Sequence, residues 1–192
     1  MKVLYLGPKR EMLISHMELQ GDEVRHTEEI ISLESTILEE IEFIVSFGYR
    51  HLIKRTIIDL FPQRIINLHI SLLPWNKGSD PNLWSFLEDT PKGVTIHYID
   101  YGLDTGEILV QQEVIMDNND TLSSSYNKLE SSIVELFKKD WVGIRDCQIA
   151  AYPQPIGGSI HRMKDKAQYE QYLTEGWETP ISKLVGRARD MD

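Results

Sequence analysis

Three side chains in the middle of this sequence could together hold and protonate a tetrahedral oxyanion. Asn67 and His69 stand two residues apart, and Asp104 follows further along the chain. An amide and an imidazole can donate hydrogen bonds to an oxygen that gains negative charge, and a carboxylate favours the charged imidazolium. The three residue types therefore suit a reaction in which a nucleophile adds to a carbonyl group.

A short strand is expected to position two of these side chains. Residues 64–66 are an arginine and two isoleucines, which indicates a buried strand over residues 64–69. Alternate residues of a strand point to the same face, so Asn67 and His69 should share one. Both can then point into one pocket.

The alternation of apolar segments predicts an α/β fold of the Rossmann-like type, with a mostly parallel sheet and helices on both faces. Ligands of such sheets bind at the carboxyl ends of the strands, where Asn67 and His69 lie. We expect strands over residues 2–6, 23–27, 43–47, 64–69, 94–99 and 107–115, and helices over 8–20, 31–40, 51–60, 80–87 and 122–141.

The amino-acid composition changes near residue 150, where prolines and glycines become frequent. We therefore predict a catalytic domain over residues 1–149 and a short C-terminal extension over 150–192, packed on the core or in a dimer. Residues 168–173 could form one more helix, and residues 176–180 a turn.

Composition limits the partners. The net charge of −10 has the wrong sign for a protein that neutralises nucleic-acid phosphates, so we expect a small-molecule partner and no nucleic acid. No apolar run approaches the roughly 20 residues that span a bilayer, and the opening apolar run is too short for a secretory signal. A cytoplasmic protein that binds no membrane is expected. Cys147 is the single cysteine, which excludes an internal disulfide and a thiolate zinc site.

The three reactive residues lie within motifs that resemble those of the formyltransferase family that uses 10-formyltetrahydrofolate. The motifs are Asn-Leu-His at 67–69, Ser-Leu-Leu-Pro at 71–74 and Leu-Asp-Thr-Gly at 103–106, in that order. The resemblance covers about residues 43–113. It implies that Asn67 donates its amide to the formyl oxygen, that His69 sits beside the same carbonyl, and that Asp104 orients His69 and passes protons through water.

By the same resemblance, the folate donor lies against two loops. Its candidate contacts are Phe47, Gly48, Tyr49, Asp100, Tyr101 and Leu103. For Tyr49 and Tyr101, aromatic packing at the base of a loop is nearly as good an interpretation as contact with the folate. We expect His97 to be structural or to act from behind the site, and no metal to be bound.

Among branches of the family, the chain is most similar to the sugar-nucleotide N-formyltransferases. The loop after Pro74 and residues 161–165 and 176–180 carry this similarity, and the candidate substrate-binding residues are Ser71, Trp75 and Lys77. The expected acceptor is the amine of a nucleotide-linked amino sugar, for a bacterial surface glycan. A homodimer is possible.

Other functions remain open at this point. Glycinamide ribonucleotide is a less suitable acceptor, because residues 7–10 read Gly-Pro-Lys-Arg in place of a glycine-and-serine turn. A tRNA acceptor would call for an added RNA-binding domain. Hydrolysis of 10-formyltetrahydrofolate by the same three residues is a second enzymatic alternative, and a folate or nucleotide-sugar binding module is the non-enzymatic one.

Overall fold

The computed structural model describes residues 1–189 and divides the chain into two compact units. Unit 1 comprises residues 1–69, 96–110 and 134–153, and unit 2 comprises residues 70–95, 111–133 and the chain from residue 154 onward. Each unit is therefore built from separated segments. The predicted boundary between residues 149 and 150 stays a prediction.

A six-stranded sheet has the order β2-β1-β3-β4-β6-β7. Its strands are β1 (Lys2–Leu6), β2 (Glu23–Thr27), β3 (Phe43–Ser46), β4 (Ile65–His69), β6 (Gly93–Tyr98) and β7 (Ile108–Glu113). The pairs β1–β2, β1–β3 and β3–β4 are parallel. Strand β3 is wholly buried, as its apolar sequence predicts, and β1 is buried except at Lys2. The predicted α/β fold with a mostly parallel sheet is confirmed.

Strands β6 and β7 form a hairpin at the end of this sheet. Tyr98 donates its backbone N–H to Glu107 O, and Val114 donates to Lys92 O, which is the pattern of antiparallel neighbours. The turn of the hairpin contains Asp104, so the hairpin brings this residue to the C-terminal end of β6, which belongs to unit 1.

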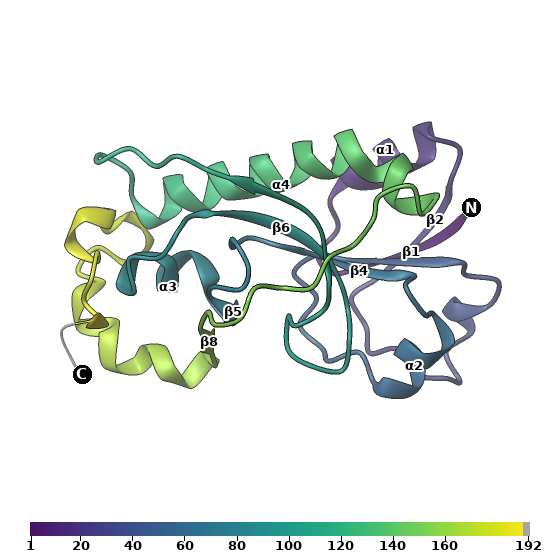
Figure 1. Ribbon diagram of the computed structural model, residues 1–192, viewed down its shortest axis with the longest axis horizontal. Coiled ribbons are helices and arrows are strands. Elements are labelled where there is room, and N and C mark those ends of the chain that lie inside the picture. The colour runs from purple at the N-terminus through teal and green to yellow at the C-terminus, as the bar shows by residue number, and fades with distance from the viewer. Residues whose placement is uncertain (190–192) are drawn as a thin grey trace. The chain divides into compact units, whose positions relative to one another are not determined.

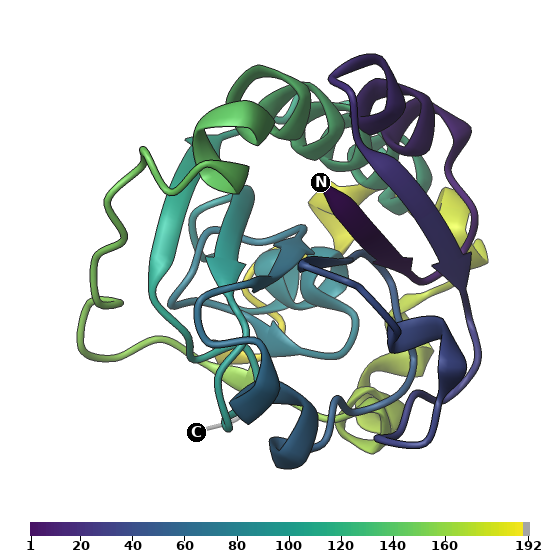
Figure 2. The ribbon, with the colours of Figure 1, turned by 90° about the vertical axis from the view of Figure 1, so that its right-hand side faces the viewer.

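Helices cover both faces of the strands in unit 1, as Figure 2 shows. On one side lie α1 (Glu11–Leu19) and the last turns of α4 (Leu122–Arg145), where Trp141 packs edge-on against Phe43 at 5.3 Å. On the other side α2 (Arg55–Leu60) buries Ile57 among residues of β1, β3 and β4. Alternation along the strands supplies an apolar surface to each layer.

Unit 2 has its own apolar core around α3 (Pro81–Leu87). The residues of this core are Leu83, Trp84, Phe86, Leu87, Leu122, Tyr169, Ile181 and Leu184. The other elements here are β5 (Lys77–Gly78), β8 (Ile160–His161) and the short 3₁₀ helices η2 (Met163–Tyr172), η3 (Gly176–Glu178) and η4 (Ile181–Lys183). Figure 1 shows α3, β5 and β8 close together.

The helix expected over residues 31–40 does not form. Only a 3₁₀ turn, η1 (Thr36–Leu38), occurs there. Ser35 Oγ accepts the Ser32 backbone N–H at 2.9 Å, and Ser32 Oγ donates to Glu34 at 2.6 Å. Such local side-chain bonds compete with a helix, and they close this segment into a turn instead.

Other expected elements form with altered ends. The helix expected from residue 51 begins only at Arg55. Of the segment expected to be helical at 168–173, all but Leu173 belongs to the longer 3₁₀ helix η2. Asp80 precedes α3 in a left-handed conformation, φ 52°, and does not cap it; its carboxylate pairs with Lys166 at 2.9 Å. Among residues 1–189, no helix has the length and apolar composition needed to cross a membrane.

Candidate functional site

The structure brings Asn67, His69 and Asp104 together in unit 1. Asp104 Oδ1 accepts a hydrogen bond from Asn67 Nδ2 at 3.3 Å, and Asp104 Oδ2 lies 3.7 Å from His69 Nδ1. His69 is buried, and the Asp104 carboxylate is largely so. The predicted grouping of an amide, an imidazole and a carboxylate is therefore present at the carboxyl end of β4.

The loop between β6 and β7 is built to hold Asp104 in place. Asp100 accepts hydrogen bonds from the Gly102 N–H at 3.0 Å and from Thr105 Oγ1 at 2.6 Å. A Cβ atom on Gly106 would stand 1.8 Å from Tyr98 O, so only glycine fits at that position. Asp104 itself has a φ of 52°, a conformation that aspartate tolerates better than most residues.

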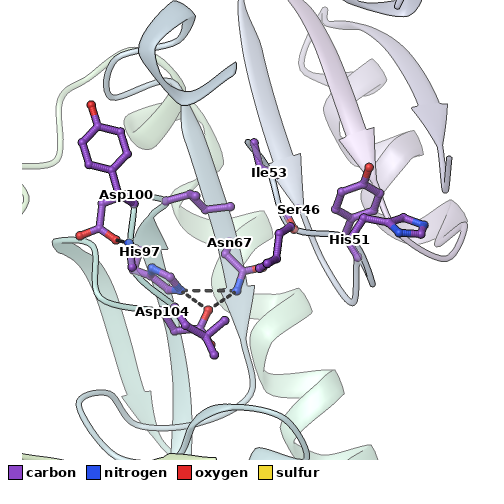
Figure 3. Close-up of a pocket in the computed structure, with 13 residues that line it drawn as sticks. Ser46, His51, Ile53, Asn67, His97, Asp100 and Asp104 are labelled. Carbon is purple, nitrogen blue, oxygen red and sulfur yellow. Dashed lines mark hydrogen bonds and ion pairs between the residues drawn. The ribbon is translucent and has the colours of Figure 1, made fainter. Parts of the chain in front are cut away.

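His97 joins this group more closely than the sequence predicts. Its Nε2 atom lies 3.4 Å from Asn67 Nδ2 and 3.6 Å from Asp104 Oδ1, as Figure 3 shows. Burial lowers the pKa of His97 to about 4, although the Asp104 charge opposes this, so the ring is neutral near pH 7. Nδ1 lies 2.8 Å from the carbonyl of Tyr98, which can only accept, so Nδ1 carries the proton and Nε2 accepts from Asn67.

A cavity of about 360 Å³ opens in unit 1 beside these side chains. The lining residues are Ser46, Tyr49, His51, Leu52, Ile53, Asn67, His97, Ile99, Asp100, Tyr101, Gly102, Leu103 and Asp104. Four of the predicted cofactor residues, Tyr49, Asp100, Tyr101 and Leu103, are among them. Sequence patterns did not single out His51, Leu52 and Ile53, although their position just after the end of β3 is a usable signal.

Phe47 and Gly48 do not line the cavity. The Phe47 side chain is buried, and the Arg10 guanidinium lies 4.0 Å from its ring centroid. Gly48 has a φ of +67°, and a Cβ there would contact Pro8. Both residues lie at the end of β3, directly before the segment that lines the cavity, so their effect on the cavity is indirect.

Each of the two predicted tyrosines also packs within the protein. The Tyr49 hydroxyl donates to Glu29 O at 2.7 Å and accepts the Ile31 N–H at 3.3 Å. The Tyr101 hydroxyl donates to Asp59 at 2.5 Å, while Arg55 lies 4.2 Å from the Tyr101 ring centroid. Both aromatic rings thus combine a structural role with a place in the cavity wall.

The predicted substrate-binding residues belong to unit 2. Ser71 is buried; its hydroxyl donates to Trp75 O at 2.8 Å, and its carbonyl accepts from Thr95 Oγ1 at 2.7 Å. Trp75 is 37% exposed, and Lys77 lies half-buried on β5. The Ser71 hydroxyl therefore shapes the loop, whereas Trp75 leaves part of its indole open to a ligand.

The prediction that no metal is bound stays a prediction. Over residues 1–189, histidine, cysteine, aspartate and glutamate side chains do not gather in groups of three or more that could hold an ion.

Comparison with solved structures reveals a similar protein over nearly the whole chain. The formyltransferase PseJ from Anoxybacillus kamchatkensis, in complex with UDP-4,6-dideoxy-4-formamido-L-AltNAc and tetrahydrofolate, is 54% identical. The match has a TM-score of 0.96 and covers 98% of this chain and 100% of that one.

Two curated relatives are more distant and longer. The dTDP-4-amino-4,6-dideoxyglucose formyltransferase of Mycobacterium bovis is 31% identical over 132 residues, 69% of this chain and 56% of that protein. The methionyl-tRNA formyltransferase of Pelobacter propionicus is 28% identical over 187 residues, 96% of this chain. The chain spans 57% of the latter protein, and about half the length of the curated relatives it matches.

Residues 12–139 match the family described as formyl transferase, which is more than half of the chain. The matched region contains Asn67, His69, Asp104 and the whole lining of the cavity. The resemblance read from the three motifs is confirmed: this chain belongs to the formyl transferase family.

Proposed function

We propose that this chain is an N-formyltransferase that moves the formyl group of 10-formyltetrahydrofolate to the amine of a nucleotide-linked amino sugar. The observation that carries the proposal is the 54% identity, over 98% of the chain, to a formyltransferase that holds tetrahydrofolate and a UDP-linked formamido sugar. The relative from Mycobacterium bovis acts on the same class of acceptor. The product would serve a bacterial surface glycan, and both substrates are metabolites of the cytoplasm.

The grouping around Asp104 supplies what the transfer needs. The acceptor amine attacks the formyl carbon, and negative charge develops on the formyl oxygen. Asn67 and His69 are the donors that would stabilise this charge, and Asp104 holds them at 3.3 and 3.7 Å. Asn67 would turn one of its two amide N–H groups from Asp104 or His97 to the formyl oxygen. A positioned donor of this kind contributes about 10²–10³ to kcat.

Protons and bonds balance within the two substrates. A bond forms between the amine nitrogen and the formyl carbon, and the bond from that carbon to N10 of the folate breaks. The amine nitrogen loses one proton and N10 gains one. Asp104 adjoins both donors, and it would relay this proton through water. No covalent bond to the protein is needed.

The cavity of unit 1 is suited to the folate. Its volume of about 360 Å³ lies within the range of small-molecule sites, and it combines apolar walls with a few polar groups. Tyr49, Asp100, Tyr101 and Leu103 would contact the folate, with His51, Leu52 and Ile53 as further wall residues. Phe47 and Gly48 would support these contacts from behind the wall.

Trp75 and Lys77 are the residues that we assign to the acceptor. An exposed indole offers a flat apolar surface to a sugar or a base, and a lysine offers positive charge to a phosphate. Ser71 would act by holding the loop that carries them, since its hydroxyl is engaged by Trp75 O.

A turnover assay tests the proposal. 10-Formyltetrahydrofolate is supplied with a panel of acceptors that contains UDP- and dTDP-linked amino sugars and glycinamide ribonucleotide. Tetrahydrofolate release is followed by absorbance, and the masses of the acceptors are measured by mass spectrometry. A gain of one formyl mass on one sugar is the expected result. Formate release without a modified sugar would identify a deformylase. Formylation of glycinamide ribonucleotide alone would identify a different acceptor, and folate binding without turnover would identify a binding module.

A further inference from the structure

The loop that carries Trp75 and Lys77 is joined through its backbone to a segment more than eighty residues away in the sequence. Strands β5 and β8 pair in parallel, with Lys77 opposite Ile160 and Gly78 opposite His161. Lys77 N–H donates to Ser159 O at 2.9 Å, and Ser79 N–H donates to His161 O at 2.9 Å. The conformation of the loop therefore depends on the C-terminal segment.

The two segments are also in tight contact next to this strand pair. Gly158 has a φ of +85°, and a Cβ there would stand 1.9 Å from Pro74 O. Any larger residue would push the loop and the C-terminal segment apart. The close approach thus fixes the distance between them just before Trp75.

A polar cluster lies beneath the strand pair, and Glu88 at the end of α3 is its centre. Glu88 Oε2 accepts hydrogen bonds from Ser159 Oγ at 2.5 Å and from Asn76 Nδ2 at 3.0 Å, while Oε1 lies 3.0 Å from His161 Nε2. Thr90 Oγ1 completes the cluster by donating to Asn76 Oδ1 at 2.8 Å. One carboxylate therefore holds groups from the loop and from the C-terminal segment.

Asn76 links this cluster to the acceptor residues. It stands between Trp75 and Lys77, is fully buried, and has a φ of 56°. A left-handed, buried residue fixes the direction of the chain on both sides of it, so its hydrogen bonds orient the side chains of both neighbours. The pKa of Glu88 lies below its usual range although burial opposes this, because His161 and Ser159 stabilise the carboxylate.

The His161 ring is fixed from a second direction. It stacks on the buried Trp84 with ring centroids 3.6 Å apart and an angle of 5° between the planes. The ring is about nine-tenths buried, so it is held between α3 and the carboxylate with little freedom to move. His161 therefore links β8 to Trp84 of α3 and to Glu88.

We infer that His161 and Glu88 are positioning residues for the acceptor: by joining β8 to the loop at Trp75–Lys77, they determine the affinity for the nucleotide-linked sugar without contacting it. The inference rests on the proposed function. In this inference the C-terminal segment takes part in recognition of the acceptor. The folate binds elsewhere, in the cavity of unit 1.

The test compares His161→Ala, His161→Gln and Met163→Ala with the unchanged protein. Met163 is an exposed residue of the same segment, so its variant controls for any change near β8. KM for the amino sugar, kcat at saturating acceptor, and the dissociation constant of tetrahydrofolate are measured. We expect His161→Ala to raise KM about tenfold or more, while kcat and the folate constant stay within about threefold. Glutamine keeps a donor for Glu88 and should restore part of the affinity.

A coupling measurement distinguishes positioning from general damage. If His161 acts through the loop, His161→Ala should raise KM much less in a Lys77→Met background than in the unchanged protein. If His161→Ala does not fold, Ser159→Ala provides a second comparison, because it removes a hydroxyl that donates to Glu88 at 2.5 Å and accepts the Asn76 N–H at 3.0 Å.

The inference is overturned if a folded His161→Ala protein keeps the KM of the unchanged protein, or if kcat or folate binding falls while KM is constant. Failure of the proposed function gives a different result: the unchanged protein then formylates no nucleotide-linked sugar, and both proposals are lost. Normal turnover by the unchanged protein with an unaltered KM in the variants rejects only the positioning role.

Discussion

Asn67 and His69 both contact Asp104, and each side chain can be removed separately. We expect Asn67→Ala and His69→Ala each to lower kcat about 10²–10³-fold, because each deletes one donor to the oxyanion. Thermal unfolding should show that both variants are folded. Asn118→Ala, at an exposed asparagine, is the matched control and should retain full activity. Near-normal turnover in either site variant would contradict the assigned mechanism.

Asp104 is expected to affect catalysis more than binding. Asp104→Asn keeps the size of the side chain but removes the charge that faces His69 at 3.7 Å. We predict a fall in kcat of about 10²-fold or more, the scale of general acid–base assistance, with the dissociation constant of tetrahydrofolate nearly unchanged. Stopped-flow turnover together with calorimetric titration of tetrahydrofolate separates the two quantities. An equal loss of folate affinity would indicate a binding role for Asp104 instead.

His97 should be neutral near pH 7. Its pKa is lowered to about 4 by burial, below the ordinary value of 6.5. Because the unfolded chain binds this proton first, the stability contributed by neutral His97 is present above pH 6.5 and is lost as pH falls from 6.5 toward 4. NMR titration of the ring, assigned with the His97→Gln variant, should show a midpoint near the lower value. A midpoint near 6.5 would contradict the neutral acceptor role toward Asn67.

At the scale of elements, the β6–β7 hairpin is the part on which the site depends most. Gly106→Ala would place a methyl group 1.8 Å from Tyr98 O, so the turn that carries Asp104 must move. We predict loss of turnover and weaker tetrahydrofolate binding, read by the same kinetic and calorimetric measurements. Gly21→Ala is the control, because it has a positive φ but open space around it and should lower stability alone.

At the scale of the whole molecule, stability and activity should separate at Asp22. This side chain is fully buried in unit 1, accepts from Trp141 Nε1 at 2.8 Å, and pairs with Arg145 at 2.9 Å. Asp22→Ala leaves a partly buried guanidinium without this partner, and we expect a loss of about 3–5 kcal/mol of unfolding free energy, measured in urea. kcat at low temperature should be unchanged.

The matched control for Asp22 is Asp146→Ala. Asp146 pairs with the same arginine at 3.0 Å but is itself exposed, so its loss should cost at most about 1 kcal/mol. Equal losses in the two variants would show that burial does not set the strength of the Asp22 contact.

Local sequence patterns are enough to predict several strands and helices of this protein and the residues of its candidate site. Strands β1 and β2 begin and end at the predicted residues, and the stripe of apolar residues between 122 and 141 forms α4, because period and burial are written directly into the sequence. The reactive trio was recognisable for a similar reason. Asn67 and His69 share a strand face by periodicity alone, and the Leu-Asp-Thr-Gly motif marks the turn that brings Asp104 to them.

Only the tertiary structure decided the features that depend on distant partners. Residues 31–40 form a turn because local side-chain hydrogen bonds replace those of a helix, although the helix propensity of the segment favours a helix. Phe47 packs against Arg10 and does not line the cavity. The contact of His97 with Asn67, and of His161 with Glu88, requires strands and loops far apart in sequence to meet. Sequence periodicity fixes which way a side chain points along its own element, but packing decides which group it meets there.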